Sequence, residues 1–548
     1  MRNNIASASR PEGGHSHQPS LRQRSKYKLA PLAVFGLLLC NALHAQGVTL
    51  TYDAASNPSD TTDKLLTIHD TANSVGPVVR SELDASNLGD SLSTLLNRRH
   101  SSNSVTVKSG TVSGNAYGAA PDIANTAAQN NQLTLEGGNV EGTVYGAFNT
   151  GSNTSAENNI VTIKNGHVKG AVYGGLGRGG NSHAKNNTVT ITGGSFGGGS
   201  DSRAGYLYGG YSWNGTTEGN HVAINAPGTK ITAVFGGGTR DTYSSNKNLI
   251  AEGNTVTVTG GTFTGQVVGG FAGRAAGNKA EGNTVLINGA DAQILGEIRG
   301  GTGRNAIHNT VKISSGSIAA GVFGGYNTFG SLPPGAPKMQ ATGNTVIIEG
   351  QPVFVPGTGQ SSLPALYGGF STNANPDKVD VLSGNTLEMR TKGTTVGNIH
   401  NFERINFYLP SDIAAGEKVL TLTDTSGTGI AGRKIGVELP AGARLAQGDR
   451  IVLIHTANGT LTSGAGNLVN QLHATSGSAL LYRFKLSSDR QNLYATVTGT
   501  PTPTSTPAST PAPGTGGGTG LGGSTGGSSA GSGSTGGGMA ARLNPQTK

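Results

Sequence analysis

The sequence is poor in charge, in cysteine and in tryptophan. Only 13% of its 548 residues are charged, against about a quarter in an ordinary soluble protein. It contains one cysteine and one tryptophan, whereas glycine reaches 90 residues. No strict three-residue period orders these glycines, which excludes a collagen-like chain. They indicate many turns, a flexible linker, or both.

The single cysteine, Cys40, lies in the apolar run LAPLAVFGLLLCNALHA (29–45), which follows a basic stretch ending near Lys28. This order predicts a secretory signal peptide over 1–45 with cleavage after Ala45. A lipoprotein anchor at Cys40 is the alternative, and the bulky Leu39 disfavours it. The mature chain then has no cysteine, so backbone pairing and packing must hold it together without disulfides.

The positive charge is concentrated in the same N-terminal stretch. Six basic residues against Glu12 give residues 1–45 a net charge of +5, which leaves +4 of the total of +9 for all the rest. No basic stripe follows. Because a phosphate-binding surface needs clustered Lys and Arg, nucleic-acid binding is not expected.

An asparagine recurs along the chain, at intervals of 28 residues at first. Apolar residues stand two and four positions after every copy, which predicts short strands with one buried face. Threonines such as Thr134 and Thr162 fill the position between, where they would point outward. The recurring residues, called anchor asparagines below, are Asn103, Asn131, Asn159, Asn187, Asn220, Asn254, Asn283, Asn309, Asn344 and Asn385.

A second repeated signal follows about fourteen residues after most anchors, as in VYGG at 172–175. We expect its glycines to adopt positive φ and turn the chain. The anchor asparagines are expected to tolerate a left-handed conformation and to hydrogen-bond their copies in neighbouring coils.

A unit of about 28 residues without helical periodicity is too small for a propeller blade, and it lacks the leucine-rich pattern of a horseshoe-shaped repeat protein. The sequence therefore predicts an all-β fold, a right-handed parallel β-helix of about ten coils over 101–400. An N-terminal cap is predicted over 46–100, including the helix-like SELDASNLGDSLSTLLN (81–97). Longer strands predict a β-rich C-terminal cap over 401–500, and a Pro/Thr-rich then Gly/Ser-rich linker is predicted over 501–548.

These features together resemble a type V autotransporter of Gram-negative bacteria: the leader, the anchored coils, NFERINFYLP (401–410) and ARLNPQTK (541–548). The resemblance implies that 46–400 is an adhesin-like passenger and that 401–500 assists folding during export. It also implies that 541–548 leads into an outer-membrane translocator barrel. We expect this product to lack that barrel after Lys548. A shortened gene or a separate exporter is expected, and without a translocator the product would stay in the periplasm.

No motif of catalysis or metal binding in the sequence is expected to act. GDSL (89–92) lacks the downstream Asp-x-x-His that would supply its base, so it is expected to begin a short cap helix. GLGRGG (175–180) has the glycine spacing of a dinucleotide-binding motif but opens no helix, and it is expected in a coil hinge. The twelve histidines form no zinc pattern. We therefore predict no catalytic, cofactor or metal site, with a β-helical polysaccharide-degrading enzyme as the main alternative.

Three units carry insertions, at 197–217, 326–342 and 351–369, and insertions in solenoids often serve recognition. The first gathers Arg203, Tyr206, Tyr211 and Trp213, residue types that anchor interfaces and stack on sugars. These four are predicted to bind a partner, either a host-cell or matrix protein or a glycan. The expected function is adhesion without catalysis at the cell surface or after secretion. An inert spacer or a truncated, non-functional product is a further alternative.

Overall fold

The computed structural model describes residues 48–52 and 66–70 for their backbone, and 102–499 with gaps. The gaps are 103, 109–110, 113, 121–123, 241–247, 274–276, 328–334, 336, 374, 425, 441–442, 463–468 and 471–481. The chain divides into two units, Met1–Pro501 and Thr502–Lys548, and every described residue belongs to the first. The predicted signal peptide (1–45), the helix-like stretch with GDSL (81–97) and the predicted linker (501–548) lie outside the described residues.

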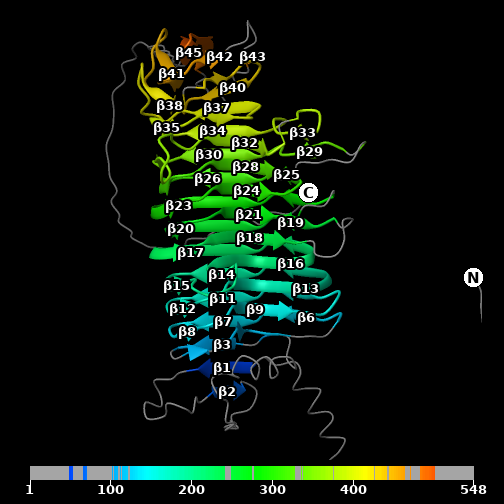
Figure 1. Cartoon of the computed structure of the whole chain (residues 1–548). Coiled ribbons are helices and arrows are strands. Elements are labelled where there is room, and N and C mark those ends of the chain that lie inside the picture. Colours follow the sequence, from blue (N-terminus) through cyan, green and yellow to red (C-terminus); the bar gives the residue numbers. More distant parts are fainter. Residues whose placement is uncertain are drawn as a thin grey trace, which may run out of the picture. The chain divides into compact units, whose positions relative to one another are not determined.

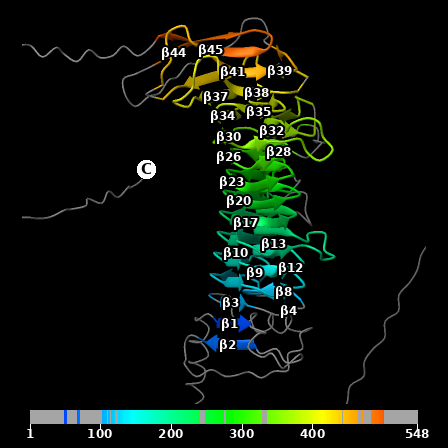
Figure 2. The same cartoon turned by 90° about the vertical axis from the view of Figure 1, so that its left-hand side faces the viewer.

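Every regular element in the described part is a β-strand. The strands wind into a right-handed parallel β-helix of about 11 turns, which confirms the predicted all-β solenoid of about ten coils. Figures 1 and 2 show the strands stacked one above another, from β2 and β1 at one end to β44 and β45 at the other.

The first long sheet contains the strands that follow the anchor asparagines. Its strands pair in parallel, in register from one coil to the next, apart from the antiparallel pair β1–β2. They are β1 (Val48–Tyr52), β2 (Leu66–Asp70), β3 (Ser104–Val107), β7 (Gln132–Leu135), β11 (Ile160–Ile163), β14 (Thr188–Ile191), β17 (His221–Ile231), β20 (Thr255–Phe263), β23 (Thr284–Ile294), β26 (Thr310–Ile313), β27 (Ser317–Ile318), β30 (Thr345–Glu349), β31 (Val353–Phe354), β34 (Thr386–Arg390), β37 (Arg404–Tyr408), β40 (Lys434–Glu438) and β43 (Val469–Asn470).

The second long sheet contains the strands built around the VYGG-type segments. All its pairings are parallel. Its strands are β5 (Ala116–Tyr117), β6 (Ala127–Gln129), β9 (Val144–Asn149), β10 (Ser155–Glu157), β13 (Val172–Lys185), β16 (Tyr206–Glu218), β18 (Ala233–Thr239), β19 (Ile250–Glu252), β21 (Val267–Phe271), β22 (Lys279–Glu281), β24 (Ile298–Thr302), β25 (Asn305–Ile307), β28 (Val322–Asn327), β29 (Met339–Gln340), β32 (Leu366–Ser371), β33 (Val379–Asp380) and β36 (Ile399–His400).

Three smaller sheets complete the coils. One contains β4 (Thr111–Val112), β8 (Asn139–Val140), β12 (His167–Val168) and β15 (Ser195–Phe196). Another contains β35 (Thr394–Val396), β38 (Lys418–Leu422), β41 (Arg450–Thr456), β45 (Asn492–Gly499) and β44 (Arg483–Ser488). The last pairs β39 (Thr428–Gly429) with β42 (Leu461–Thr462).

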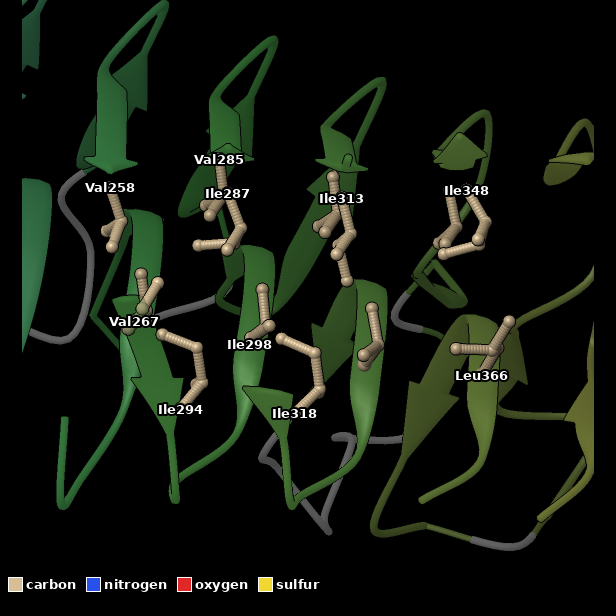
Figure 3. Close-up of a cluster of buried hydrophobic side chains, with 14 of the residues drawn as sticks. Val258, Val267, Val285, Ile287, Ile294, Ile298, Ile313, Ile318, Ile348 and Leu366 are labelled. Carbon is tan, nitrogen blue, oxygen red and sulfur yellow. The ribbon is translucent and has the colours of Figure 1, made fainter. Parts of the chain in front are cut away.

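Rows of apolar side chains fill the interior. All twenty apolar positions predicted from the anchors are buried, with at most 4% of any side chain exposed. Figure 3 shows how the rows run along the stack: Val258, Ile287, Ile313 and Ile348 lie in one row, and Val267, Ile298 and Leu366 in a facing one. Burying each such side chain contributes about 1.5–3 kcal/mol. The core is therefore continuous from coil to coil.

The anchor asparagines form a buried hydrogen-bonded ladder, as predicted. All nine that the structure describes, from Asn131 to Asn385, are 0% exposed. Each of the first eight donates from Nδ2 to the Oδ1 of the next anchor at 2.8–3.1 Å, and the last, Asn385, donates to backbone carbonyls such as that of Ala341. Each Oδ1 also accepts the backbone N–H of the preceding anchor, as Asn254 does from Asn220 at 3.1 Å. Because each amide uses both its donor and its acceptor, the ladder fixes the register of neighbouring coils.

The expected left-handed conformation falls on the residue before each anchor, and the described anchors themselves do not adopt it. Those preceding residues have φ between 53° and 71°, whether asparagine, serine, histidine or glycine. The left-handed residue turns the chain so that the anchor side chain points inward, into the ladder. The prediction of a left-handed anchor was therefore wrong by one position.

The glycines of the VYGG-type segments do not turn the chain, which corrects a second expectation. Gly174 and Gly175 lie inside β13, and neither has positive φ. A Cβ on Gly174 would lie closer than 3.0 Å to the carbonyl oxygen of Gly209 in the next coil, and a Cβ on Gly175 would overlap the amide of Asn187. These glycines are required because the strand passes directly against the neighbouring coil and the asparagine ladder.

Parallel stacking continues across the predicted boundary at 400/401. Strands β34, β37 and β40 pair in register, with Ile405 and Phe407 continuing the buried rows. The alternation of buried apolar residues thus continues beyond the last anchor asparagine, Asn385. Antiparallel pairing at this end begins with β45, which pairs with both β41 and β44. A reversed strand at the end of a solenoid closes the edge that would otherwise pair with another chain.

Candidate interaction surface

A ladder of stacked aromatic rings runs along the outer face of the second sheet. Because the coils pair in register, the aromatic residue of each VYGG-type segment lies directly over the one before it. The rings are Tyr117, Tyr145, Tyr173, Tyr208 and Phe235, with centroids 5.1, 5.3, 4.8 and 4.9 Å apart in that order. Stacked rings at this spacing add about 0.5–1.5 kcal/mol per pair beyond burial. The ladder is therefore a rigid feature of the coils.

The four residues predicted to bind a partner are all found against this ladder. Tyr211, in β16, is buried and packs edge-on against Tyr173 at 5.9 Å and Tyr208 at 5.0 Å. Tyr206 is half-buried, with its ring 6.1 Å from that of Phe235. The structure thus brings the predicted residues together on one surface, which we call the aromatic patch: Arg203, Tyr206, Tyr211 and Trp213.

Arg203 covers one end of the patch. Its guanidinium lies 5.2 Å from the centroid of the Tyr211 ring, and its Nη1 donates to the hydroxyl of Tyr173 at 3.4 Å. Burial raises the pKa of Tyr173 to about 12, although the charge of Arg203 lowers it. Burial also raises the pKa of Tyr211, so Tyr173 and Tyr211 stay neutral at physiological pH and Arg203 is the source of positive charge within the patch itself.

Trp213 belongs to strand β16 and packs against the same aromatic cluster. The guanidinium of the exposed Arg178 lies 4.6 Å from the Trp213 ring centroid, a cation–π contact between neighbouring coils. The indole Nε1 is buried without a hydrogen-bond partner among the described residues. The ring is thus held by packing and by Arg178.

A second aromatic cluster, which the sequence reasoning missed, lies farther along the same face. The ladder resumes with Phe323, Tyr367 and His400, each ring centroid 4.7 Å from the next, and Phe370 packs edge-on against Tyr367 at 5.4 Å. Between the two parts of the ladder, Val268 and Arg299 occupy the aligned positions. The LYGG at 366–369 repeats the VYGG signal, so Tyr367 was detectable. His400 does not lie in a VYGG-type segment, so no sequence pattern predicted its place in the ladder.

Many of the exposed carboxylates on the coils are paired with lysines of a neighbouring coil. Lys164 lies 3.0 Å from Glu136, Lys185 lies 2.9 Å from Glu218, and Lys312 lies 2.9 Å from Glu349. Such exposed pairs contribute at most about 1 kcal/mol each. Their regular placement supports the register of the coils.

The other motifs considered from the sequence have structural roles or lie outside the residues that the structure describes. GLGRGG (175–180) is part of strand β13, where no helix follows, so it is not a dinucleotide turn. Among the described residues, no group of three or more His, Cys, Asp or Glu side chains is placed to hold a metal ion. Within that same part of the chain, no helix is long and apolar enough to cross a membrane.

No protein-family model matches the chain, and a comparison with curated proteins finds no match either.

Proposed function

We propose that this protein is an exported adhesin-like passenger of the type V autotransporter class, which binds a partner without catalysis. It acts at the cell surface or after secretion, and its partner is a protein or glycan of a host cell or of the extracellular matrix. Outer-membrane export machinery is its second partner class. The observation that carries the proposal is the aromatic patch: Arg203, Tyr206 and Trp213 are half-buried around the buried Tyr211, on a stacked ladder.

The composition and the rigidity of the patch favour binding. Tyrosine, tryptophan and arginine supply most of the affinity of typical interfaces, because they bury large areas with few rotatable bonds. Here the rings are already ordered by stacking across coils, so a partner would lose little side-chain entropy on binding. The patch also belongs to the 197–217 insertion, where the chain departs from its basic repeat.

A non-catalytic role is supported by the use made of the charged groups. Carboxylates that would serve as general acids or bases are instead paired with lysines between coils, as with Glu136 and Lys164.

One observation favours the alternative of a polysaccharide-degrading enzyme. Glu297, His400 and Asp424 line a single hollow of about 320 Å³. Two carboxylates and an imidazole around one hollow are the residue types that glycoside chemistry uses. Sustained turnover of a polysaccharide by the purified full chain, lost in Asp424→Asn, would establish this alternative.

The patch is tested by the double substitution Arg203→Ser with Tyr206→Ser. Both side chains are partly exposed, so the coil should remain folded while the patch loses its charge and one ring. We expect binding of the purified full chain to epithelial cells and matrix-coated surfaces to fall at least tenfold. The matched control is Lys230→Ser, an exposed residue of β17 on the other sheet, which should bind normally.

Equal binding by the double variant and by wild type would contradict the role of the patch. A wild-type chain that binds neither cells nor matrix would instead favour an inert spacer.

A further inference from the structure

Two hollows adjoin each other around the second aromatic cluster, near the C-terminal end of the second sheet. The first, of about 260 Å³, is lined by Tyr367, Phe370, Asn373, Pro376, His400 and Asn401, among others. The second, of about 320 Å³, is lined by Glu297, Phe323, Ser362, Tyr367, His400 and Asp424, among others. Tyr367 and His400 belong to both linings, and their stacked rings are called the shared wall below.

The wall is held rigidly. Tyr367 is stacked between Phe323 and His400, with 4.7 Å between centroids on each side, and Phe370 contacts its edge. The 351–369 insertion supplies Ser362, Leu363 and Ala365 to the second hollow. An insertion that departs from the repeat thus builds part of this site. The volume of each hollow is close to that of the smallest ligand pockets, which span roughly 300–1,000 Å³. Each hollow therefore has room for about one ring-sized group.

The polar groups at the second hollow have defined states. Burial lowers the pKa of His400, so its imidazole is neutral at pH 7 and offers one donor and one acceptor. The backbone N–H of Ser426 and the amide of Asn398 donate to Asp424 at 2.9 and 3.4 Å, and these hydrogen bonds hold the pKa of its carboxyl below the usual value. Asp424 therefore presents an ionised carboxylate, an acceptor for hydroxyl groups.

The charge balance of the second hollow is negative. Its lining includes the carboxylates of Glu297 and Asp424. Glu297 pairs with the guanidinium of Arg299, which also lies 3.5 Å from the centroid of the Tyr326 ring. Arg299 is therefore committed to its own neighbours, and the hollow repels an anionic ligand.

We propose that the two hollows bind consecutive residues of a non-acidic glycan chain, with Tyr367 and His400 contacting both sugars. Both faces of the Tyr367 ring are covered by Phe323 and His400, so the sugars would contact the edges of these stacked rings, while Asp424, Glu297 and His400 suit their hydroxyl groups. Two ring-sized hollows with a shared wall fit two linked rings better than a peptide, whose side chains alternate in direction. This site is separate from the aromatic patch, and the proposal made for it does not depend on the function proposed for the patch.

The test measures binding of the purified full chain to neutral β-1,4-linked glucose and N-acetylglucosamine oligomers, to chitosan oligomers and to polygalacturonate oligomers. Calorimetry gives the affinities, and saturation-transfer NMR gives the contacting sugar protons. We expect neutral or cationic oligomers of two or more residues to bind, and the acidic oligomers to bind at least tenfold more weakly.

Two variants localise the binding. Ser362→Trp fills the second hollow from its exposed rim and should weaken binding at least tenfold, whereas Ser361→Trp, the exposed neighbour, should not. Asp424→Asn removes a charge without changing shape and should also weaken binding, whereas Asp291→Asn, on the exposed face of β23, should not. Unchanged circular dichroism identifies the folded variants.

The proposal is overturned if no non-acidic oligomer binds the wild-type chain, if acidic oligomers or peptides bind better, or if Ser362→Trp leaves the affinity unchanged. Cell binding that depends on Arg203 and Tyr206 while all oligosaccharides fail would sink this proposal and leave the proposed function standing.

Discussion

A chain carrying Asn254→Asp is expected to lose ordered structure in the coils on both sides of residue 254 at neutral pH. In the wild-type protein, Nδ2 of Asn254 donates to the carbonyl oxygen of Thr217 at 3.2 Å and to Oδ1 of Asn283 at 3.0 Å. The carboxylate has the same shape but no proton, so its second oxygen would face two acceptors. An uncompensated buried charge of this kind costs about 3–5 kcal/mol.

The pH dependence of this variant has a definite sign. One oxygen of the introduced carboxyl keeps the two donors of Asn220, but the other is buried against acceptors only, which raises the carboxyl pKa. The folded state then binds a proton more tightly than the unfolded state. The penalty is largest above the folded pKa and diminishes as pH falls toward the ordinary pKa of an aspartate. Lowering the pH should therefore restore part of the protection in this variant.

Hydrogen exchange is the appropriate measurement, because long repeat arrays do not unfold in one step. The backbone amides of β19, β20 and β22 should exchange much faster in the variant than in wild type. The matched control is Asn153→Asp in the exposed ladder formed with Asn125 and Asn181, where the change should cost no more than about 0.5 kcal/mol. Equal protection in the two variants would mean that the buried ladder does not hold the coils together.

Gly174→Ala is expected to separate two coils at the second sheet. The new methyl group would meet the carbonyl oxygen of Gly209 closer than 3.0 Å and would lie 3.0 Å from Cβ of Asn187. Since the obstacle is backbone of the next coil, no side-chain rotation relieves it. A cost of about 3 kcal/mol is expected, at the upper end for an overpacked core.

The control for this substitution lies in the same strand. In Gly180→Ala the new methyl group would have only Ser152 Oγ nearby, at 3.9 Å, so β13 should be preserved. Limited proteolysis and thermal unfolding followed by circular dichroism compare the two variants. A normal melting profile for Gly174→Ala would show that the coils are less closely packed than the structure describes.

The sequence alone was sufficient for the class of fold because the inward positions of a solenoid repeat. Pairs such as Val161 and Ile163 recur at a fixed distance from the anchor, and in-register parallel pairing places each over its copy. The ladder of amides was predictable for the same reason. The position of the left-handed residue was not, since asparagine occurs both at the anchor and just before it in Asn158–Asn159.

The candidate surfaces were less predictable because they depend on which residues share a face across coils. Arg203, Tyr206, Tyr211 and Trp213 are close in sequence, so their clustering was foreseeable. Two insertions lie between Phe323 and Tyr367, and His400 follows without a VYGG-type segment, so only the register of β28, β32 and β36 brings the three together. The hollows beside them depend on the fold of those insertions, which no periodicity describes.

Hydroxyl-radical footprinting of the full chain, free and bound to a cell or matrix surface, tests most directly whether the partner binds the aromatic patch. Tyr206 and Trp213 report on the patch. Ile160 in β11 and Leu295 just after β23, 39% and 45% exposed, report on the first sheet. We predict that binding suppresses oxidation of Tyr206 and Trp213 and leaves Ile160 and Leu295 unchanged. Protection of Ile160 and Leu295 with Tyr206 and Trp213 still oxidised would contradict the account.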